Sequence, residues 1–213
     1  MVISAGFSSG FVHSSLVVKG DADVTMNNIL QSIPLFRAEI FGWFVILVLD
    51  IIIAWASYIF LKQIDNSLAL LGAWLRIVYA TFLGIAISNL IFITLLLNGN
   101  SYLSSIPTEQ LKAQMMLYLN AFNNIWSLGL IIFGLHLFIL AYLVLKSNFI
   151  PKFIGILLFI ASFSYISVHS LHSFIPQYEN FTVLFENILS VPMAIGELSL
   201  GIWLLLKGGK TKK

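Results

Sequence analysis

Four residues that ionise or carry a charge lie inside otherwise apolar stretches of this sequence: Asp50, Arg76, His136 and Glu197. Placing Asp, Lys or Arg at the centre of a membrane helix costs roughly 2.5–3.5 kcal/mol on insertion scales, so such residues usually face the protein interior. With a helical rise of 1.5 Å per residue, Asp50 lies about 16 Å from the predicted inner end of its stretch, and His136 and Glu197 about 14 Å. Arg76 lies about 9 Å deep and reaches the same level with its long side chain. The four residues therefore predict one buried polar layer.

The polar layer has two interpretations, and the sequence leaves both open. In the first, the layer binds a proton, an ion or a small molecule, with Asp50 and Glu197 as titrating carboxylates and His136 as a relay. In the second, an Asp50–Arg76 ion pair and a hydrogen bond between His136 and Glu197 hold the helices in register.

His169 and His172 form an H-x-x-H pattern, which can place two imidazoles on one helix face as metal ligands. They lie about 28 Å from the inner end of their stretch, too far from the polar layer to share its ligands. Histidines at a membrane interface also serve as amphipathic anchors, and we predict no metal site. The sequence has no cysteine, no H-E-x-x-H and no Walker loop. We therefore predict no catalytic residue and no cofactor.

The composition indicates which solvent surrounds these residues. The 213 residues are 59% hydrophobic and only 9% charged, with a mean hydropathy of +0.97. Soluble domains carry about 25% charged residues, because water must solvate their surface. The net charge of +2 is small, and the basic residues form no groove-like patch, so we expect no nucleic-acid partner. The predicted partner is the lipid bilayer, and protein partners or self-association cannot be read from the sequence.

The apolar stretches predict an all-α polytopic transmembrane bundle. The most informative stretch is the hairpin from Ile125 to Ile160, in which Lys146 to Lys152 separates two apolar runs. Each run is long enough to cross a hydrocarbon core of about 30 Å. The whole chain, 1–213, is predicted to be a single transmembrane domain. Its parts are an N-terminal segment (1–39), five spans (about 40–61, 70–97, 124–145, 150–168 and 187–206) and a basic tail (207–213). Gly129, Gly134 and Gly201 are predicted to mark close helix packing.

Two shorter helices are predicted outside the spans. Asp21 has the position of a helix N-cap for a short interfacial helix that Pro34 would stop. Thr108 to Gln110 has the composition of a first helical turn. We expect that turn to open a separate interfacial helix before the third span.

The distribution of basic residues predicts the topology. Seven of the eleven Lys and Arg lie in the loops after spans one and three and in the tail. The positive-inside rule therefore places the C-terminus in the cytoplasm and segment 1–39 on the outer face. Trp43 and Trp126 fall near the predicted outer ends of their spans, as interfacial anchors do. We expect a multi-pass protein of the bacterial inner membrane.

Several segments of the chain resemble the DUF4386 family of bacterial membrane proteins. They are GFVHSSLVVKGDA (10–22), the block IFGLHLFILAYLVLKSNFIPKFIGILLFIASFSYI (132–166), HSFIPQY (172–178) and IGELSLGIWLLLKG (195–208). The resemblance implies one more helix immediately before Phe11, so Met1 would be a truncated or misassigned start. An acidic residue and a histidine often precede the third span in this family, where this chain has Asn120 and Phe122. The resemblance implies no established activity.

The resulting prediction is a non-enzymatic membrane protein. Its polar layer serves either as an ion or small-molecule site or as a structural network between helices. The alternative is an intramembrane hydrolase acting on lipids, or a metal-dependent membrane enzyme.

Overall fold

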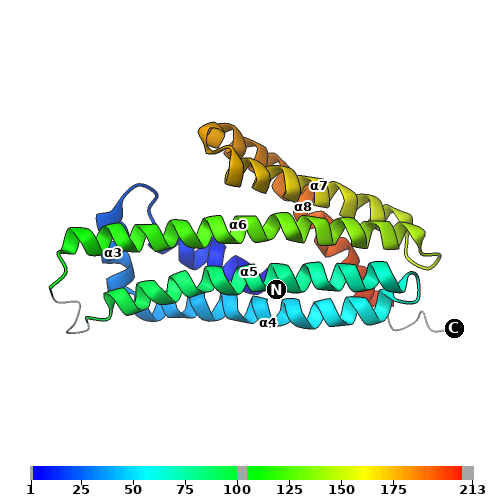
Figure 1. Cartoon of the computed structure of the whole chain (residues 1–213), viewed down its shortest axis with the longest axis horizontal. Coiled ribbons are helices and arrows are strands. Elements are labelled where there is room, and N and C mark those ends of the chain that lie inside the picture. The colour runs from blue at the N-terminus through cyan, green and yellow to red at the C-terminus, as the bar shows by residue number, and fades with distance from the viewer. Residues whose placement is uncertain (1, 100–104, 208–213) are drawn as a thin grey trace. The chain divides into compact units, whose positions relative to one another are not determined.

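The computed structural model describes residues 2–99 and 105–207. Within these ranges the chain is helical and contains no strand. Five helices are long and apolar enough to cross a membrane, which confirms the predicted all-α, multi-pass architecture (Figure 1). They are α4 (Ile33–Leu61), α5 (Asn66–Leu97), α6 (Thr108–Lys146), α7 (Lys152–Phe174) and α8 (Glu179–Lys207). Apart from Lys207, the predicted basic tail lies outside the described residues.

The long helices expose large apolar side chains that no other part of the described chain covers. Phe41 on α4, Trp74 on α5 and Phe153 on α7 are each at least 59% exposed. Soluble proteins rarely expose so much contiguous apolar surface. In a bilayer the same surface meets lipid, and the helix satisfies its own backbone hydrogen bonds. The exposed side chains thus fit the membrane environment that the composition predicts.

The N-terminal segment is more helical than predicted. It contains α1 (Val2–Ala5), the π-helix η1 (Gly6–His13), α2 (Ser14–Leu16) and α3 (Ala22–Gln31). The predicted N-cap is confirmed, because the Asp21 side chain accepts a hydrogen bond from the backbone N–H of Val24 at 2.9 Å. The predicted role of Pro34 is wrong: α3 already ends at Gln31, and Pro34 lies in the first turn of α4. Proline suits that turn, where its missing N–H would have no helical partner.

The separate interfacial helix that the sequence predicted before the third span is absent from the described structure. Instead α6 runs without interruption from Thr108 through 39 residues. No proline or glycine stands between Thr108 and Ile125 to break the helix. At 1.5 Å per residue α6 is about 58 Å long, well beyond a hydrocarbon core of about 30 Å. Its first turns therefore extend past the apolar part of the span.

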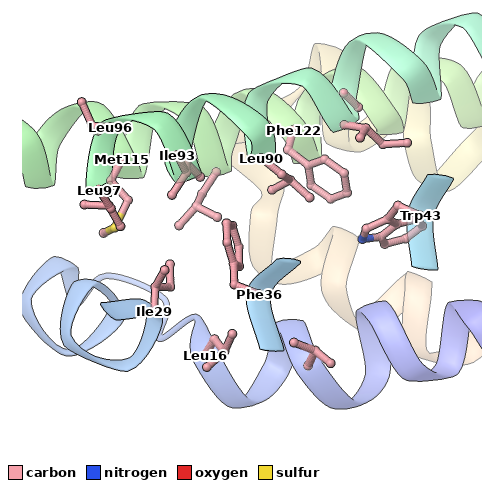
Figure 2. Close-up of a cluster of buried hydrophobic side chains, with 14 of the residues drawn as sticks. Leu16, Ile29, Phe36, Trp43, Leu90, Ile93, Leu96, Leu97, Met115 and Phe122 are labelled. Atoms are coloured by element: carbon pink, nitrogen blue, oxygen red, sulfur yellow. The ribbon is translucent and has the colours of Figure 1, made fainter. Parts of the chain in front are cut away.

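The described chain divides into two compact units. The first contains Met1–Asp50 and Thr81–Trp126, and the second contains Ile51–Ala80 and Ser127–Lys213. Helices α4, α5 and α6 each contribute a segment to both units. In the first unit, N-terminal residues such as Leu16 and Ile29 bury their side chains against the long helices, and Figure 2 shows this core. In the second unit, α7 and α8 pack against each other, joined by the short helix η3 (Pro176–Tyr178).

Polar contacts stabilise the turns of the second unit. Asp65 caps α5 by accepting a hydrogen bond from the Leu68 N–H at 3.1 Å, and Lys146 donates to its other oxygen at 2.9 Å. These contacts, led by the one with Lys146, lower the pKa of Asp65 below its ordinary value of 3.8. Lys152 donates to the carbonyls of Leu145 and Ser147, and these carbonyls lie at the C-terminal end of α6, where cations are favoured.

Candidate functional site

Arg76 and His136, two of the four predicted polar-layer residues, are in direct contact in the second unit. Both are buried, with exposed fractions of 6% and 0%. His136 Nδ1 lies 2.8 Å from the backbone oxygen of Gly72. A carbonyl only accepts, so Nδ1 carries the proton and Nε2 is the acceptor. Arg76 Nη1 lies 3.2 Å from this Nε2 and donates to it. One segment of α5 therefore engages both ring nitrogens of a neutral imidazole on α6.

Phe133 lies at the centre of the aromatic surroundings of this pair. It precedes His136 by three residues, which places both side chains on one face of α6. The Arg76 guanidinium carbon lies 5.3 Å from the Phe133 ring centroid, within cation–π range. Tyr79 from α5 contacts the same ring at 5.0 Å, and Tyr165 from α7 meets it edge-on at 5.2 Å. The guanidinium is thus buried against an aromatic face as well as an imidazole.

Glu197, the third predicted residue, binds Tyr165, a residue that the sequence interpretation missed. The Tyr165 hydroxyl donates a hydrogen bond from α7 to the Glu197 carboxylate on α8. Gly196 permits this contact, because a Cβ at position 196 would lie 2.5 Å from the Ala161 Cβ and 2.8 Å from the Leu157 carbonyl oxygen. The absence of a side chain lets α8 approach α7 closely enough for the bond to form. A tyrosine in an apolar span has no sequence signal that would have identified this role.

Asp50, the fourth predicted residue, is buried and belongs to the first unit. Its pairing with Arg76, which lies in the second unit, stays a prediction. The partners just described for His136 and Glu197 differ from the His136–Glu197 pair expected in the packing interpretation. Whether the four residues form one layer also stays a prediction.

His169 is held by a serine rather than by an acidic residue. Its Nδ1 lies 3.0 Å from Ser127 Oγ on α6, and Ser173 Oγ donates to the same serine oxygen at 3.4 Å. The His169 ring also stacks on Tyr165, with 5.8 Å between ring centroids. Among the described residues no three His, Asp or Glu side chains come together as metal ligands. The structure therefore offers His169 and His172 no third metal ligand in the described part of the chain.

A second buried carboxylate, Glu39 in the first unit, was also missed by sequence reasoning. Its side chain is fully buried, and Oε1 lies 2.8 Å from His13 Nδ1 and 3.4 Å from Trp43 Nε1. The Ser8 hydroxyl donates to the Glu39 backbone oxygen at 3.1 Å and so fixes η1 against α4. Oε2 makes no hydrogen bond within the described chain. The sequence did not identify Glu39 as a buried residue, because it directly precedes the first predicted span and so falls in the segment 1–39 that was expected outside the membrane.

Aromatic rings pack against Trp43 and His13, the two side chains that contact this second carboxylate. Trp43 meets Phe122 at 5.4 Å and Trp126 at 4.8 Å between ring centroids, both edge-on. Phe122 also stacks on Trp126 at 6.0 Å and contacts the His13 ring at 6.1 Å. Trp43 and Phe122 are labelled in Figure 2 among the side chains of the first-unit core. The Trp126 indole N–H is buried and has no acceptor among the described residues. We call Glu39, His13, Trp43, Phe122 and Trp126 the Glu39 cluster.

The fold and these sites define an all-helical, multi-pass membrane protein with two buried polar clusters. The family model of DUF4386, a domain of unknown function, matches residues 1–208, and the chain belongs to this family. This confirms the resemblance seen in the sequence motifs. An uncharacterized protein from Archaeoglobus fulgidus is 33% identical over 172 residues, which cover 81% of this chain and 85% of the relative. The similarity thus extends to an archaeon. No solved structure matches the chain.

Proposed function

We propose that the chain is a non-enzymatic protein of the cell membrane whose polar residues in the second unit hold its helices in register. The observation that carries this proposal is that a polar link joins each successive pair of helices from α5 to α8. Arg76 and His136 link α5 to α6, and Tyr165 and Glu197 link α7 to α8. Between them, Ser162 on α7 donates to the Gly134 carbonyl on α6 at 2.7 Å. Hydrogen bonds between membrane helices are a common source of such specificity.

The partners of these groups favour packing over ligand binding. A ligand site needs donors or acceptors that are left for the ligand, whereas both nitrogens of His136 are engaged by α5. The Ser162 hydroxyl and His169 Nδ1 are engaged in the same way, each across a helix interface. Buried polar groups that find partners on neighbouring helices fix the register of those helices. The second unit then acts as a rigid framework.

A double-mutant cycle on Tyr165→Phe and Glu197→Gln tests the proposal. Each variant keeps the shape of its side chain: Tyr165→Phe removes the donor of the α7–α8 link, and Glu197→Gln replaces its carboxylate acceptor by a neutral amide. Inter-helix hydrogen bonds in membrane proteins contribute on average about 0.6 kcal/mol and at most about 1.7 kcal/mol. We expect a coupling energy of this size in the free energy of unfolding in detergent. Ser190→Ala, which alters a hydroxyl bonded within its own helix, is the control and should show no coupling to Glu197→Gln. Zero coupling between Tyr165 and Glu197 would overturn the packing role.

A second candidate function, a lipid-acting hydrolase, is favoured by one observation. Ser127 and His169 lie at nucleophile–base distance, 3.0 Å, near the predicted membrane interface. Ser127, however, lies within α6, where the neighbouring N–H groups are committed to helix hydrogen bonds and cannot form an oxyanion hole. Labelling with a fluorophosphonate probe distinguishes the two functions. Modification that requires Ser127 and His169 would establish the hydrolase, and we expect none.

A further inference from the structure

The Glu39 cluster differs from the polar links of the second unit because two of its polar atoms lack partners. Glu39 Oε2 is an acceptor without a donor, and Trp126 Nε1 is a donor without an acceptor. Both atoms are buried, and neither has a hydrogen-bond partner among the described residues of the chain. A buried polar group without a partner costs roughly 1–3 kcal/mol, and more when the group is charged. An unpaired acceptor and an unpaired donor in one cluster therefore indicate that a further group, from outside the described chain, binds there.

The chemistry of these two orphan atoms defines what that group must offer. Glu39 Oε1 lies within hydrogen-bond distance of His13 Nδ1 and Trp43 Nε1, so its contacts within the cluster are already made. Oε2 therefore requires a donor, and a cationic donor is best suited to it. Trp126 requires an acceptor oxygen, since an indole N–H only donates. The rings of Trp43, Phe122 and Trp126 supply apolar contact for a short carbon chain and attract a cation.

The geometry points to the Glu39 cluster as a binding site for an amino-alcohol group, an ammonium separated by two carbons from an oxygen. The ammonium donates to Glu39 Oε2, and the ligand oxygen accepts from Trp126 Nε1. This group occurs both in free ethanolamine and in the headgroup of phosphatidylethanolamine. The inference concerns the first unit and is independent of the packing role proposed for the second.

Other ligand classes fit the cluster less well. An anion would meet the Glu39 carboxylate without a facing arginine or lysine in the cluster. A metal ion would find one carboxylate and one imidazole, and the described residues bring no third His, Asp or Glu to them. An apolar ligand would leave both orphan atoms unsatisfied. An amino alcohol satisfies both at once.

The position of His13 indicates how a ligand reaches the cluster. The His13 side chain is 19% exposed, whereas Glu39 is fully enclosed and Trp43 and Phe122 are at most 2% exposed. His13 ends η1, a π-helix, and π-helical turns occur mostly as short insertions near functional sites. We infer that a ligand enters on the His13 side, where a ring less buried than Trp43 and Phe122 borders Glu39. The topology expected from the sequence places this side at the outer face.

Thermal unfolding of the full chain tests the inference. The protein is purified into nanodiscs of phosphatidylcholine and titrated with ethanolamine at constant ionic strength. Ligands that bind the folded state alone raise the Tm in a saturable way, and we expect this of ethanolamine. Ethylene glycol, which lacks the ammonium, and tetramethylammonium, which lacks both N–H donors and the oxygen, should shift the Tm far less. A parallel sample in phosphatidylethanolamine nanodiscs tests the lipid headgroup as the source.

Two variants assign the effect to the cluster. Glu39→Gln removes the charge, and Trp126→Phe removes only the N–H and keeps an aromatic ring. Hydrogen bonds to charged groups are worth enough that we expect Glu39→Gln to weaken ethanolamine binding roughly ten- to a hundredfold. Trp126→Phe should weaken it roughly tenfold. Trp55→Phe is the matched control, because Trp55 is 66% exposed on α4 and should leave binding unchanged.

Each outcome decides the inference. Stabilisation by ethanolamine, by phosphatidylethanolamine or by both, lost in Glu39→Gln, supports it and identifies the source. An equal response in wild type and both variants, or none to either source, overturns it. If Glu39→Gln fails to fold, Trp126→Phe gives the decision, because loss of one buried N–H with retention of a ring is a small change in packing. The coupling between Tyr165 and Glu197 would remain unaffected, so failure here is distinct from failure of the packing role.

Discussion

Replacement of Gly196 by alanine should separate α7 from α8. A Cβ at position 196 would lie 2.5 Å from the Ala161 Cβ and 2.8 Å from the Leu157 carbonyl oxygen. Non-bonded carbon atoms are most favourable about 3.5–4.0 Å apart, so the two helices must move by about 1 Å. Neither contact is the flexible end of a side chain. Overpacking of this kind costs typically about 1–3 kcal/mol, and we expect Gly196→Ala to lower the free energy of unfolding by that amount.

Gly201→Ala provides a matched control on the same helix. A Cβ at position 201 would have no described neighbour within 4 Å. Alanine favours helix by about 1 kcal/mol over glycine, so this variant should equal or exceed the wild type in stability. Both variants are unfolded by denaturant in the same detergent, and tyrosine absorbance is followed for the environment of Tyr165. If Gly196→Ala is as stable as Gly201→Ala, the close approach of α7 and α8 is refuted.

Two further predictions concern the turns and the topology. Lys146 and the Leu68 N–H lower the pKa of Asp65, so the stabilisation by its carboxylate should be present above pH 3.8 and be lost as the pH falls through the lowered value. The stability difference between wild type and Asp65→Asn, measured by unfolding from pH 6 down to pH 3, should therefore shrink toward the acid end; a constant difference would contradict the assignment. For topology, the chain has no cysteine of its own, and Asn27→Cys should react with an impermeant maleimide on intact cells while Gln63→Cys reacts only after permeabilisation. The reverse pattern would invert the predicted orientation.

The sequence was sufficient for the spans because their signal is strong and local. A bilayer demands about 20 apolar residues per helix, and the structure has five helices that are long and apolar enough to cross one. Helix ends were harder to predict. Pro34 and the run after Thr108 were interpreted as breaks, but the first suits an initial turn and the second contains no breaker. Propensity alone does not indicate where an amphipathic segment leaves the membrane.

Side-chain partners could not be predicted, because they depend on which helix faces meet. Close packing was expected at Gly129, Gly134 and Gly201. The structure confirms it at Gly134, where a Cβ would lie 3.1 Å from the Ser162 carbonyl oxygen, but not at Gly201, and at Gly129 it stays a prediction. Gly196 makes the close contact on α8 instead. With 3.6 residues per turn, five residues rotate a helix position by about 140°, so Gly196 and Gly201 point to different sides. Tyr165 could not be predicted as the partner of Glu197 for the same reason, because the sequence does not show which faces of α7 and α8 meet.

Glu39→Gln separates a binding role from a packing role even before any ligand is added. If Glu39 served only to hold His13, glutamine would replace a carboxylate acceptor by a neutral amide oxygen, and the weaker hydrogen bond costs roughly 1 kcal/mol. If Glu39 is kept for a ligand, the unliganded protein bears the cost of an enclosed carboxylate oxygen without a donor. Glutamine can still accept from His13 and carries no charge that needs compensation, so it should stabilise the unliganded protein while abolishing the response to ethanolamine. Functional sites often show this opposition between stability and activity. Destabilisation of the unliganded protein by Glu39→Gln would instead assign Glu39 to the framework.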